Sequence, residues 1–385
     1  MPVTVWLLGL VSMLMDISSE MIHGLLPVFM VTVLGASATT IGAIEGVAEA
    51  TALIVKVFSG VISDFFGKRK LLAGLGYGLA ALTKPMFALA ASTDWILTAR
   101  FVDRIGKGIR GAPRDALITD VTPPGLRGAA FGLRQALDTV GAFAGPLLAM
   151  GLMLLWSNDF RAVFWVAVIP AFLALAMLVL GVREPASIAR SSNRAFPISR
   201  QALHKLSSDY WWVVAVGAAL TLARFSEAFL ILRAQQAGVA LAFIPMVLIV
   251  MNVVYAACAY PFGILADKMR HGILLGFGIL PLITADLLLA HGSQLPWLGA
   301  GLVFWGIHMA ATQGLLAAMV ADTAPEELRG TAFGLFNLAS GLAMLIASTL
   351  AGLLWDRLGA SVTFYTGAMF AGIALMLLLL HKNAR

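Results

Sequence analysis

The strongest constraint on this chain is an internal repeat. Residues 120–132 read DVTPPGLRGAAFG, and residues 322–334 read DTAPEELRGTAFG, 202 positions later. A second pair keeps nearly the same spacing, because residues 60–70 read GVISDFFGKRK and residues 263–271 read GILADKMRH. Self-similarity at one spacing is the signature of a duplicated unit. In a membrane protein, such repeats commonly face each other across a substrate site.

The composition predicts a membrane protein. Of the 385 residues, 60% are hydrophobic and 12% are charged, and the mean hydropathy is +0.91. A soluble domain carries about 25% charged residues, and a helix needs roughly 20 apolar residues to cross a bilayer. We therefore expect an all-α membrane protein whose twelve transmembrane helices form two pseudo-symmetric six-helix bundles. The predicted helices lie near residues 4–34, 40–63, 71–91, 95–119, 128–155, 160–182, 209–234, 238–265, 273–290, 296–320, 330–355 and 361–380.

The basic residues predict the orientation of the chain. With a cytoplasmic N-terminus, fourteen Lys and Arg residues fall in the inside connections and three in the outside ones, as the positive-inside rule requires. We therefore expect a multi-pass protein of the inner (plasma) membrane with both termini in the cytoplasm. The basic connections are short and lack interleaved aromatic residues, which argues against nucleic-acid binding. No cleaved signal peptide is expected, because the start of the chain lacks a basic segment.

The repeat divides the chain into two six-helix halves, residues 1–182 and 209–385, joined by a polar cytoplasmic linker at 183–208. A loop signature follows the second helix of each half. Its first copy keeps Gly60, Asp64, Gly67, Arg69 and Lys70, and its second keeps Gly263, Asp267 and Lys268. With these motifs the chain resembles the major facilitator superfamily over its whole length. The resemblance implies transport by alternating access and gating roles for Asp64, Arg69 and Asp267.

The two copies of the signature also depart from the pattern of the superfamily. Phe65 stands where a basic residue is usual, and Arg270 replaces a glycine. Asp64 nevertheless has a physical role that does not depend on the resemblance. A carboxylate at the cytoplasmic end of the second helix could cap the positive N-terminus of the helix predicted at 330–355 and hold that side closed. The alternative is that Asp64 and the basic cluster at 68–70 only fix the topology.

The fifth helix carries a glycine pattern that bears on the direction of transport. Through Gly132, Gly141, Gly145 and Pro146 it resembles the antiporter motif of exporting branches of the superfamily, although residues 149 and 150 are not the usual closing glycines. Helical spacing places Gly141 and Gly145 on the face of Asp138. Because glycines let a neighbouring helix approach closely, we predict a gating seal or bend at Gly141, Gly145 and Pro146. Ordinary small-residue packing is the alternative.

Eighteen charged residues fall at membrane depth, and their distribution is uneven. The first half holds eight bases and seven acids, and the second half holds one base and two acids. A charge at the bilayer centre costs about 2.5–3.5 kcal/mol on insertion scales, so these side chains must face one another or water. In one interpretation, the acids of the first two helices neutralise the bases of the fourth in a structural network. In the other, at least one carboxylate exchanges protons and one or two arginines hold the substrate.

Helical spacing selects candidates within these charged faces. For proton coupling we predict Asp16, Glu20 and Glu49, because carboxylates in a partly dry cavity can load and release protons near neutrality. The predicted substrate contacts are Arg100, Arg104, Lys107, Asn252, Tyr255 and His308. The planar guanidinium of arginine suits a carboxylate or phosphate. Residues 103–115 hold three glycines and a proline among charges, so we expect the fourth helix to break or bend there.

These features together predict a secondary active transporter. We expect proton-coupled export of a small, anionic or amphipathic organic solute by a monomer in the lipid bilayer. Proton-coupled uptake or uniport of an anionic nutrient or iron chelate is the alternative, and a membrane sensor would need a soluble domain or long tail. No nucleophile–base constellation indicates an enzyme, and no nucleotide motif indicates a primary pump. A single cysteine, Cys258, predicts no metal site, and we expect no cofactor.

Overall fold

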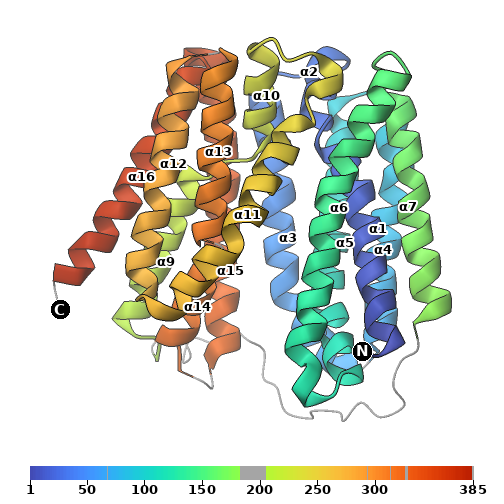
Figure 1. Cartoon of the computed structure of the whole chain (residues 1–385), viewed down its shortest axis with the longest axis vertical. Helices are drawn as coiled ribbons and strands as arrows, with labels where there is room; N and C mark the ends of the chain where they lie inside the picture. Colours follow the sequence, from blue (N-terminus) through green and yellow to red (C-terminus); the bar gives the residue numbers. More distant parts are fainter. Residues whose placement is uncertain (67, 183–204, 293, 313, 326–327, 384–385) are drawn as a thin grey trace. The chain divides into compact units, whose positions relative to one another are not determined.

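The computed structural model describes residues 1–66, 68–182, 205–292, 294–312, 314–325 and 328–383. In this part of the chain the secondary structure is helical, without a strand (Figure 1). The first half contains α1 (Val3–His23), α2 (Leu26–Thr32), α3 (Ala38–Phe66), α4 (Arg69–Ala88), α5 (Thr93–Val121), η1 (Pro124–Leu126), α6 (Arg127–Leu155) and α7 (Phe160–Gly181). The second half contains α9 (Ser208–Ala223), α10 (Ala228–Gln236), η2 (Leu241–Phe243), α11 (Met246–Lys268), α12 (His271–His291), α13 (Leu295–Thr312), α14 (Leu315–Thr323), α15 (Arg329–Leu358) and α16 (Ala360–Asn383).

Most of these helices match membrane spans in length and hydropathy. Within the described residues, ten stretches are long and apolar enough to cross a membrane, with α1–α2, α9–α10 and α13–α14 each counted as one. α3 and α5 contain 29 residues each and are also long enough to cross. They carry many of the charges expected at membrane depth. With these two helices the predicted twelve spans are accounted for, and the all-α membrane architecture is confirmed.

The contacts between helices group the chain into two compact units. The first comprises Met1–Leu34, Thr51–Phe196 and Leu241–Met246, and the second comprises Gly35–Ala50, Pro197–Ala240 and Val247–Arg385. The start of α3 belongs to the second unit because it packs closely on α15. A methyl group added at Gly42 would overlap Ser348 O, and one added at Gly352 would overlap Ala38 O.

The predicted domain boundaries lie on either side of the linker at 183–208. Residues 183–204 of the predicted linker lie outside the described residues. The division of the chain at 182 and 209 therefore stays a prediction.

Local side-chain chemistry sets several helix ends. Ser92, Asp159 and Ser207 precede α5, α7 and α9, and each accepts a hydrogen bond from a backbone N–H of the first turn. These donors have no partner within the helix, so such caps stabilise its start. Gly359 lies between α15 and α16 with φ of +91°, a conformation that glycine adopts without steric cost.

The expected break in the fourth helix is wrong. α5 continues through residues 103–115 as one helix and contains Pro113. One of its glycines serves close packing instead, because a Cβ added at Gly106 would lie 2.6 Å from Gly76 O of α4. Interruptions occur elsewhere, between α1 and α2, between α9 and α10, and between α13 and α14. The sequence pattern alone could not separate a glycine that breaks a helix from one that fits against a neighbour.

The internal repeat extends to the packing of two helix pairs, α4 with α5 and α12 with α13. In the first pair, a Cβ added at Gly76 would lie 2.7 Å from Arg110 Cβ. In the second pair, a Cβ added at Gly278 would lie 2.6 Å from Thr312 Cγ2. Both residues of the second contact stand 202 positions after those of the first. The duplicated unit therefore keeps the close approach of its third and fourth helices.

Candidate functional site

The contact between α1 and α6 brings two sets of predicted residues together. A Cβ added at Gly141 would lie 2.9 Å from Asp16 Cβ, and one added at Gly145 would lie 2.8 Å from Glu20 Cβ. Real Cβ atoms essentially never approach within 3.0 Å, so both positions accept only glycine without displacement of a helix. The glycines predicted for gating thus lie directly against the two acids of α1 that are predicted for proton coupling.

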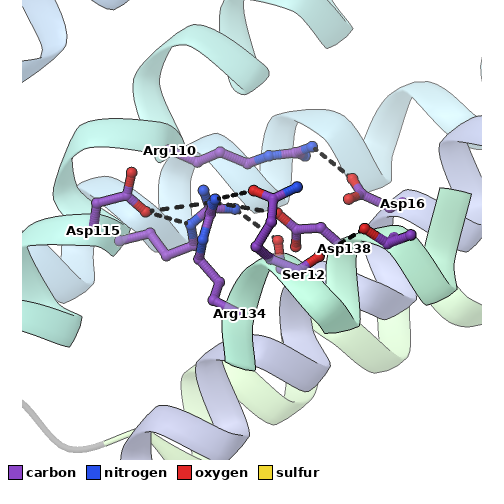
Figure 2. Close-up of polar contacts among 9 residues, drawn as sticks. Ser12, Asp16, Arg110, Asp115, Arg134 and Asp138 are labelled. Atoms are coloured by element: carbon purple, nitrogen blue, oxygen red, sulfur yellow. Dashed lines mark hydrogen bonds and ion pairs between the residues drawn. The ribbon is translucent and has the colours of Figure 1, made fainter. Parts of the chain in front are cut away.

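A chain of polar contacts extends from this interface to α5 (Figure 2). Arg134 Nη1 of α6 lies 3.2 Å from Asp138 Oδ2 and 3.6 Å from Asp115 Oδ1. Arg114 of α5 donates from Nε to the same Asp115 oxygen over 3.0 Å and from Nη1 to Ser12 Oγ over 2.6 Å. Asp115 is therefore shared between two guanidinium groups. Such a network holds α1, α5 and α6 together through charge-assisted hydrogen bonds.

Asp16 occupies a looser position beside this chain. Its Oδ1 lies 4.0 Å from Arg110 Nη2, and its side chain is 30% exposed. The guanidinium carbon of Arg110 lies 4.8 Å from the centre of the Tyr77 ring, a cation–π contact. Figure 2 shows the Arg110 side chain reaching towards Asp16. At 4.0 Å the two charges attract, but the separation exceeds that of a hydrogen bond, so Asp16 is held only loosely by Arg110.

The other predicted carboxylates have different surroundings. Glu20 Oε2 lies 3.6 Å from His23 Nδ1, one turn further along α1, and its side chain is 27% exposed. Glu49 is half-buried on the part of α3 that belongs to the second unit, where Glu45 is fully buried. The structure thus places two of the three proton-coupling candidates in the first unit and the third in the second.

The bases of α5 do not share a single environment. Arg100 and Arg104 are 4% and 5% exposed, whereas Lys107 is exposed. The buried acid between them, Asp103, binds Lys84 of α4, whose Nζ lies 2.9 Å from Asp103 Oδ1. The prediction that acids of the first two helices neutralise the fourth is therefore incomplete, because α4 supplies a base to an acid of α5.

Three polar residues of this region were missed in the sequence. Ser12 accepts from Arg114, Ser19 Oγ lies 3.1 Å from Lys84 Nζ, and Tyr77 stacks under Arg110. Ser12 stands four residues before Asp16, and Tyr77 stands seven before Lys84, so each shares a helix face with a charged residue. That spacing was a usable signal for both.

The predicted residues of the second half lie in the second unit. Asn252 and Tyr255 are half-buried on α11. His308 of α13 is fully buried, and its Nδ1 lies 2.7 Å from Gly278 O of α12. A carbonyl oxygen only accepts, so Nδ1 carries the proton and donates it. The substrate roles of these three residues, and of the α5 bases, stay predictions.

The gating candidates are only partly described. The Asp64 side chain lies outside the described residues, so its predicted contact with the helix at 330–355 stays a prediction. Arg69 begins α4 and pairs with Asp120 near the end of α5. Asp267 is exposed near the end of α11, and Pro146 is buried within α6.

Asp356, an acid that was not predicted as a site residue, links the end of α15 to the start of α3. Asp356, near the end of α15, accepts the backbone N–H groups of Ala38 over 3.0 Å and of Thr39 over 2.8 Å. It thereby caps the start of α3. Asp356 stands directly after the predicted span at 330–355, and that position was the available signal in the sequence.

The chemistry of these groups fits binding and proton exchange. The described residues of the first unit offer guanidinium groups, carboxylates at two levels of exposure, and hydroxyls. In the part of the chain that the structure describes, no three residues among His, Cys, Asp and Glu gather as metal ligands would.

Comparison with known proteins agrees with this architecture. The sequence profile of the Major Facilitator Superfamily matches residues 8–251 and 214–385. The uncharacterized MFS-type transporter MJ1317 of Methanocaldococcus jannaschii is 35% identical, over 97% of this chain and 94% of the relative. Over a shorter stretch, 37% of this chain and 34% of the relative, the multidrug resistance protein MdtH of Photorhabdus laumondii is 32% identical.

A solved structure supports the same fold. The crystal structure of a point mutant of the nucleoside transporter NupG matches with a TM-score of 0.80 over 99% of each chain at 13% identity. At this identity the match concerns the fold alone. The profile and the relative from Methanocaldococcus jannaschii both cover nearly the whole chain. The chain therefore belongs to the Major Facilitator Superfamily of membrane transporters.

Proposed function

We propose that this transporter exports a small amphipathic organic solute in exchange for protons, by alternating access. The observation that carries the proposal is the position of Asp16, which lies 4.0 Å from Arg110 and is 30% exposed. Such a carboxylate is open to water, so it can receive a proton. It also faces a fixed positive charge, so loss of its own charge changes the local balance of forces.

The exchange follows from competition for one carboxylate. The proton and a positively charged or hydrogen-bond-donating end of the solute cannot both occupy Asp16. Arrival of a proton from the outside therefore releases the solute, and departure of the proton to the inside readmits it. Arg100, Arg104 and Lys107 are the proposed contacts for a second, polar or acidic, part of the solute, with Glu20 as a second proton carrier.

The α1–α6 contact supplies a place where this event can act on the helices. Asp16 and Glu20 lie on the backbone of α6 at Gly141 and Gly145, with no side chain between them. A change in the charge of either acid is therefore felt at a tight helix contact, which favours a discrete shift over a gradual one. The named function of MdtH, multidrug resistance, favours export.

The second candidate is symport of an anionic solute, and it also rests on the contact between Asp16 and Arg110. An anion would compete with Asp16 for Arg110, so it would bind when Asp16 is protonated and would travel with the proton. The distribution of basic residues supports an orientation with both termini in the cytoplasm, and the proposed transporter acts as a monomer in the inner membrane. Because the two candidates differ in both the direction of transport and the charge of the solute, one experiment tests both.

Inside-out membrane vesicles with an acidic lumen provide the test. Ethidium serves as the lipophilic cation and carboxyfluorescein as the organic anion, and vesicles without the protein give the background. We expect ethidium to accumulate with the wild-type protein and not with Asp16→Asn or Glu20→Gln. The control is Asp94→Asn, which neutralises an exposed acid in the first turn of α5.

The outcomes separate the two candidates. Full gradient-driven accumulation in both Asp16→Asn and Glu20→Gln, with folding intact, would remove these acids from proton coupling. Uptake of carboxyfluorescein into right-side-out vesicles from an acidic medium, without ethidium transport, would favour anion symport over the exchange proposed here.

A further inference from the structure

Asp286 is an acid of the second unit to which the proposed mechanism gives no part. It lies in α12, its side chain is fully buried, and neither carboxyl oxygen has a hydrogen-bond partner among the described residues. A Cβ added at Gly367 of α16 would lie 2.7 Å from Asp286 Oδ2 and 2.9 Å from Phe225 Cε1. The carboxyl group therefore lies against bare helix backbone and the edge of an aromatic ring.

Phe225, which lies with Asp286 against Gly367, belongs to an aromatic cluster. The ring of Phe225 lies 6.2 Å from that of Trp305, 5.6 Å from that of Phe364 and 5.5 Å from that of Phe229. Trp305 is 1% exposed, and its Nε1 has no hydrogen-bond partner among the described residues. The edge of an aromatic ring carries only a weak partial positive charge, so it does not replace the full positive charge that a buried carboxylate needs as a partner.

The charged groups of the neighbouring helices have other contacts. Arg233 of α10 donates from Nε to Leu289 O of α12 over 2.9 Å. Arg224 and Glu227 interact with one another between α9 and α10. His308 of α13 faces Gly278.

The remaining two neighbours of α12 add no nearby charge. In α14, Asp322 pairs with His271 at the start of α12. From Ala360 to Leu380, α16 contains no charged residue.

The internal repeat gives this position a direct counterpart. Lys84 and Asp103 stand 202 positions before Asp286 and Trp305. The first pair forms a buried ion pair, with Lys84 Nζ 2.9 Å from Asp103 Oδ1. The second half has an acid in place of the base and a tryptophan in place of the acid. Ionised without a partner, such a buried acid would carry the full cost of desolvation, so the neutral acid is the form that suits this site.

We propose that Asp286 is a proton-binding site of the second repeat, which holds a proton while buried and releases it when water reaches the carboxyl group. On release, the carboxyl O–H bond breaks and the proton passes to water as hydronium. The proton site itself is independent of the proposed exchange, and only its link to transport rests on that function.

Infrared spectroscopy of the purified protein in lipid bilayers tests the site. We expect a carbonyl band of a protonated carboxylic acid that is lost in Asp286→Asn, shifted in Asp286→Glu and retained in Asp322→Asn. The last variant neutralises an exposed acid at the end of a neighbouring helix. An unchanged band in folded Asp286→Asn, or the absence of any such band in the wild type at neutral pH, would overturn the proposal.

The link to transport has a separate readout. In inside-out vesicles, Asp286→Asn is expected to lose ethidium accumulation under an acidic lumen and to retain ethidium equilibration without a gradient. Full accumulation in this variant would overturn the link. If the wild type itself shows no gradient-driven ethidium flux while the infrared band depends on Asp286, the proposed exchange fails and the proton site stands.

Discussion

The helix pairs α4–α5 and α12–α13 keep the same close packing in both halves but hold different polar groups. Gly76 and Gly278 lie against Arg110 and Thr312, and the counterpart of Gly106 is His308, which donates to Gly278 O. The backbone approach has thus been retained. The polar groups between the helices have changed, because Asp286 and Trp305 occupy the positions in the second half that correspond to the Lys84–Asp103 ion pair of the first. Helix packing constrains the backbone of a repeat, while the charges within it are free to diverge.

The contact between the start of α4 and the end of α5, and its counterpart between the start of α12 and the end of α14, diverged less. Arg69 pairs with Asp120 in the first half, and His271 pairs with Asp322 in the second, with Nδ1 3.0 Å from Oδ2. Both pairs are again separated by 202 positions. A contact at the more exposed end of the helices has therefore kept its acid and exchanged one base for another. Divergence is greatest in the buried middle, where a change of charge has the largest energetic effect.

The largest expected effect comes from breaking the ion pair of the first half. Lys84→Met keeps the length of the side chain but leaves Asp103 buried without its partner, which typically costs about 3–5 kcal/mol. Asp286→Asn in the second half replaces a neutral acid, which has no partner among the described residues, with a neutral amide of similar size, so we expect a change within about 1 kcal/mol. Thermal unfolding of the two purified variants measures the difference. Equal losses of stability in the two variants would show that the Lys84–Asp103 pair and Asp286 contribute alike to stability, contrary to the expected difference.

A smaller effect on stability is expected at a second difference between the halves, which is the presence of glycines in α6 where α15 has alanines. The counterparts of Gly141 and Gly145 in α15 are Ala343 and Ala347, both buried. Gly145→Ala makes the first half resemble the second, but its Cβ would overlap Glu20. Overpacking costs about 1–3 kcal/mol, and alanine returns up to about 1 kcal/mol of helix propensity, so we expect a net loss of about 1–2 kcal/mol. Gly132→Ala, with no atom within 4 Å of the added Cβ, is the control and should be neutral or stabilising.

The expected consequence of that substitution for transport is also specific. Displacement of α1 from α6 should move Asp16 relative to Arg110. We therefore expect gradient-driven ethidium flux to fall even at temperatures where Gly145→Ala remains folded. Unchanged flux in Gly145→Ala would show that the tight contact is packing alone, as one interpretation of the sequence holds.

The sequence predicted the parts of this molecule that depend on one helix at a time. Hydropathy located the spans, and helical spacing placed Gly141 and Gly145 on one face of α6. The partners across helices were not predictable, because spacing gives the face of a helix but not its rotation against a neighbour. Lys84 was therefore not assigned to Asp103, and the glycines of α5 were taken for a break. The sequence indicated two acids at membrane depth in the second half, but only the structure shows that Asp286 lacks a hydrogen-bond partner among the described residues.

The smallest expected difference concerns the acids that both halves retain at the helix ends. Asp120→Asn removes a partner of Arg69 in a pair whose side chains are 15% and 26% exposed, whereas the side chains of His271 and Asp322 are 33% and 63% exposed. Water and salt screen the second pair more, and exposed pairs contribute about 0.2–1 kcal/mol. We therefore expect Asp120→Asn to cost about 1 kcal/mol and Asp322→Asn less than about 0.5 kcal/mol. Thermal unfolding at low and high salt checks this, since added salt should narrow the gap between the variants. A larger loss in Asp322→Asn would mean that the histidine copy has gained a role beyond that of the arginine pair it replaced.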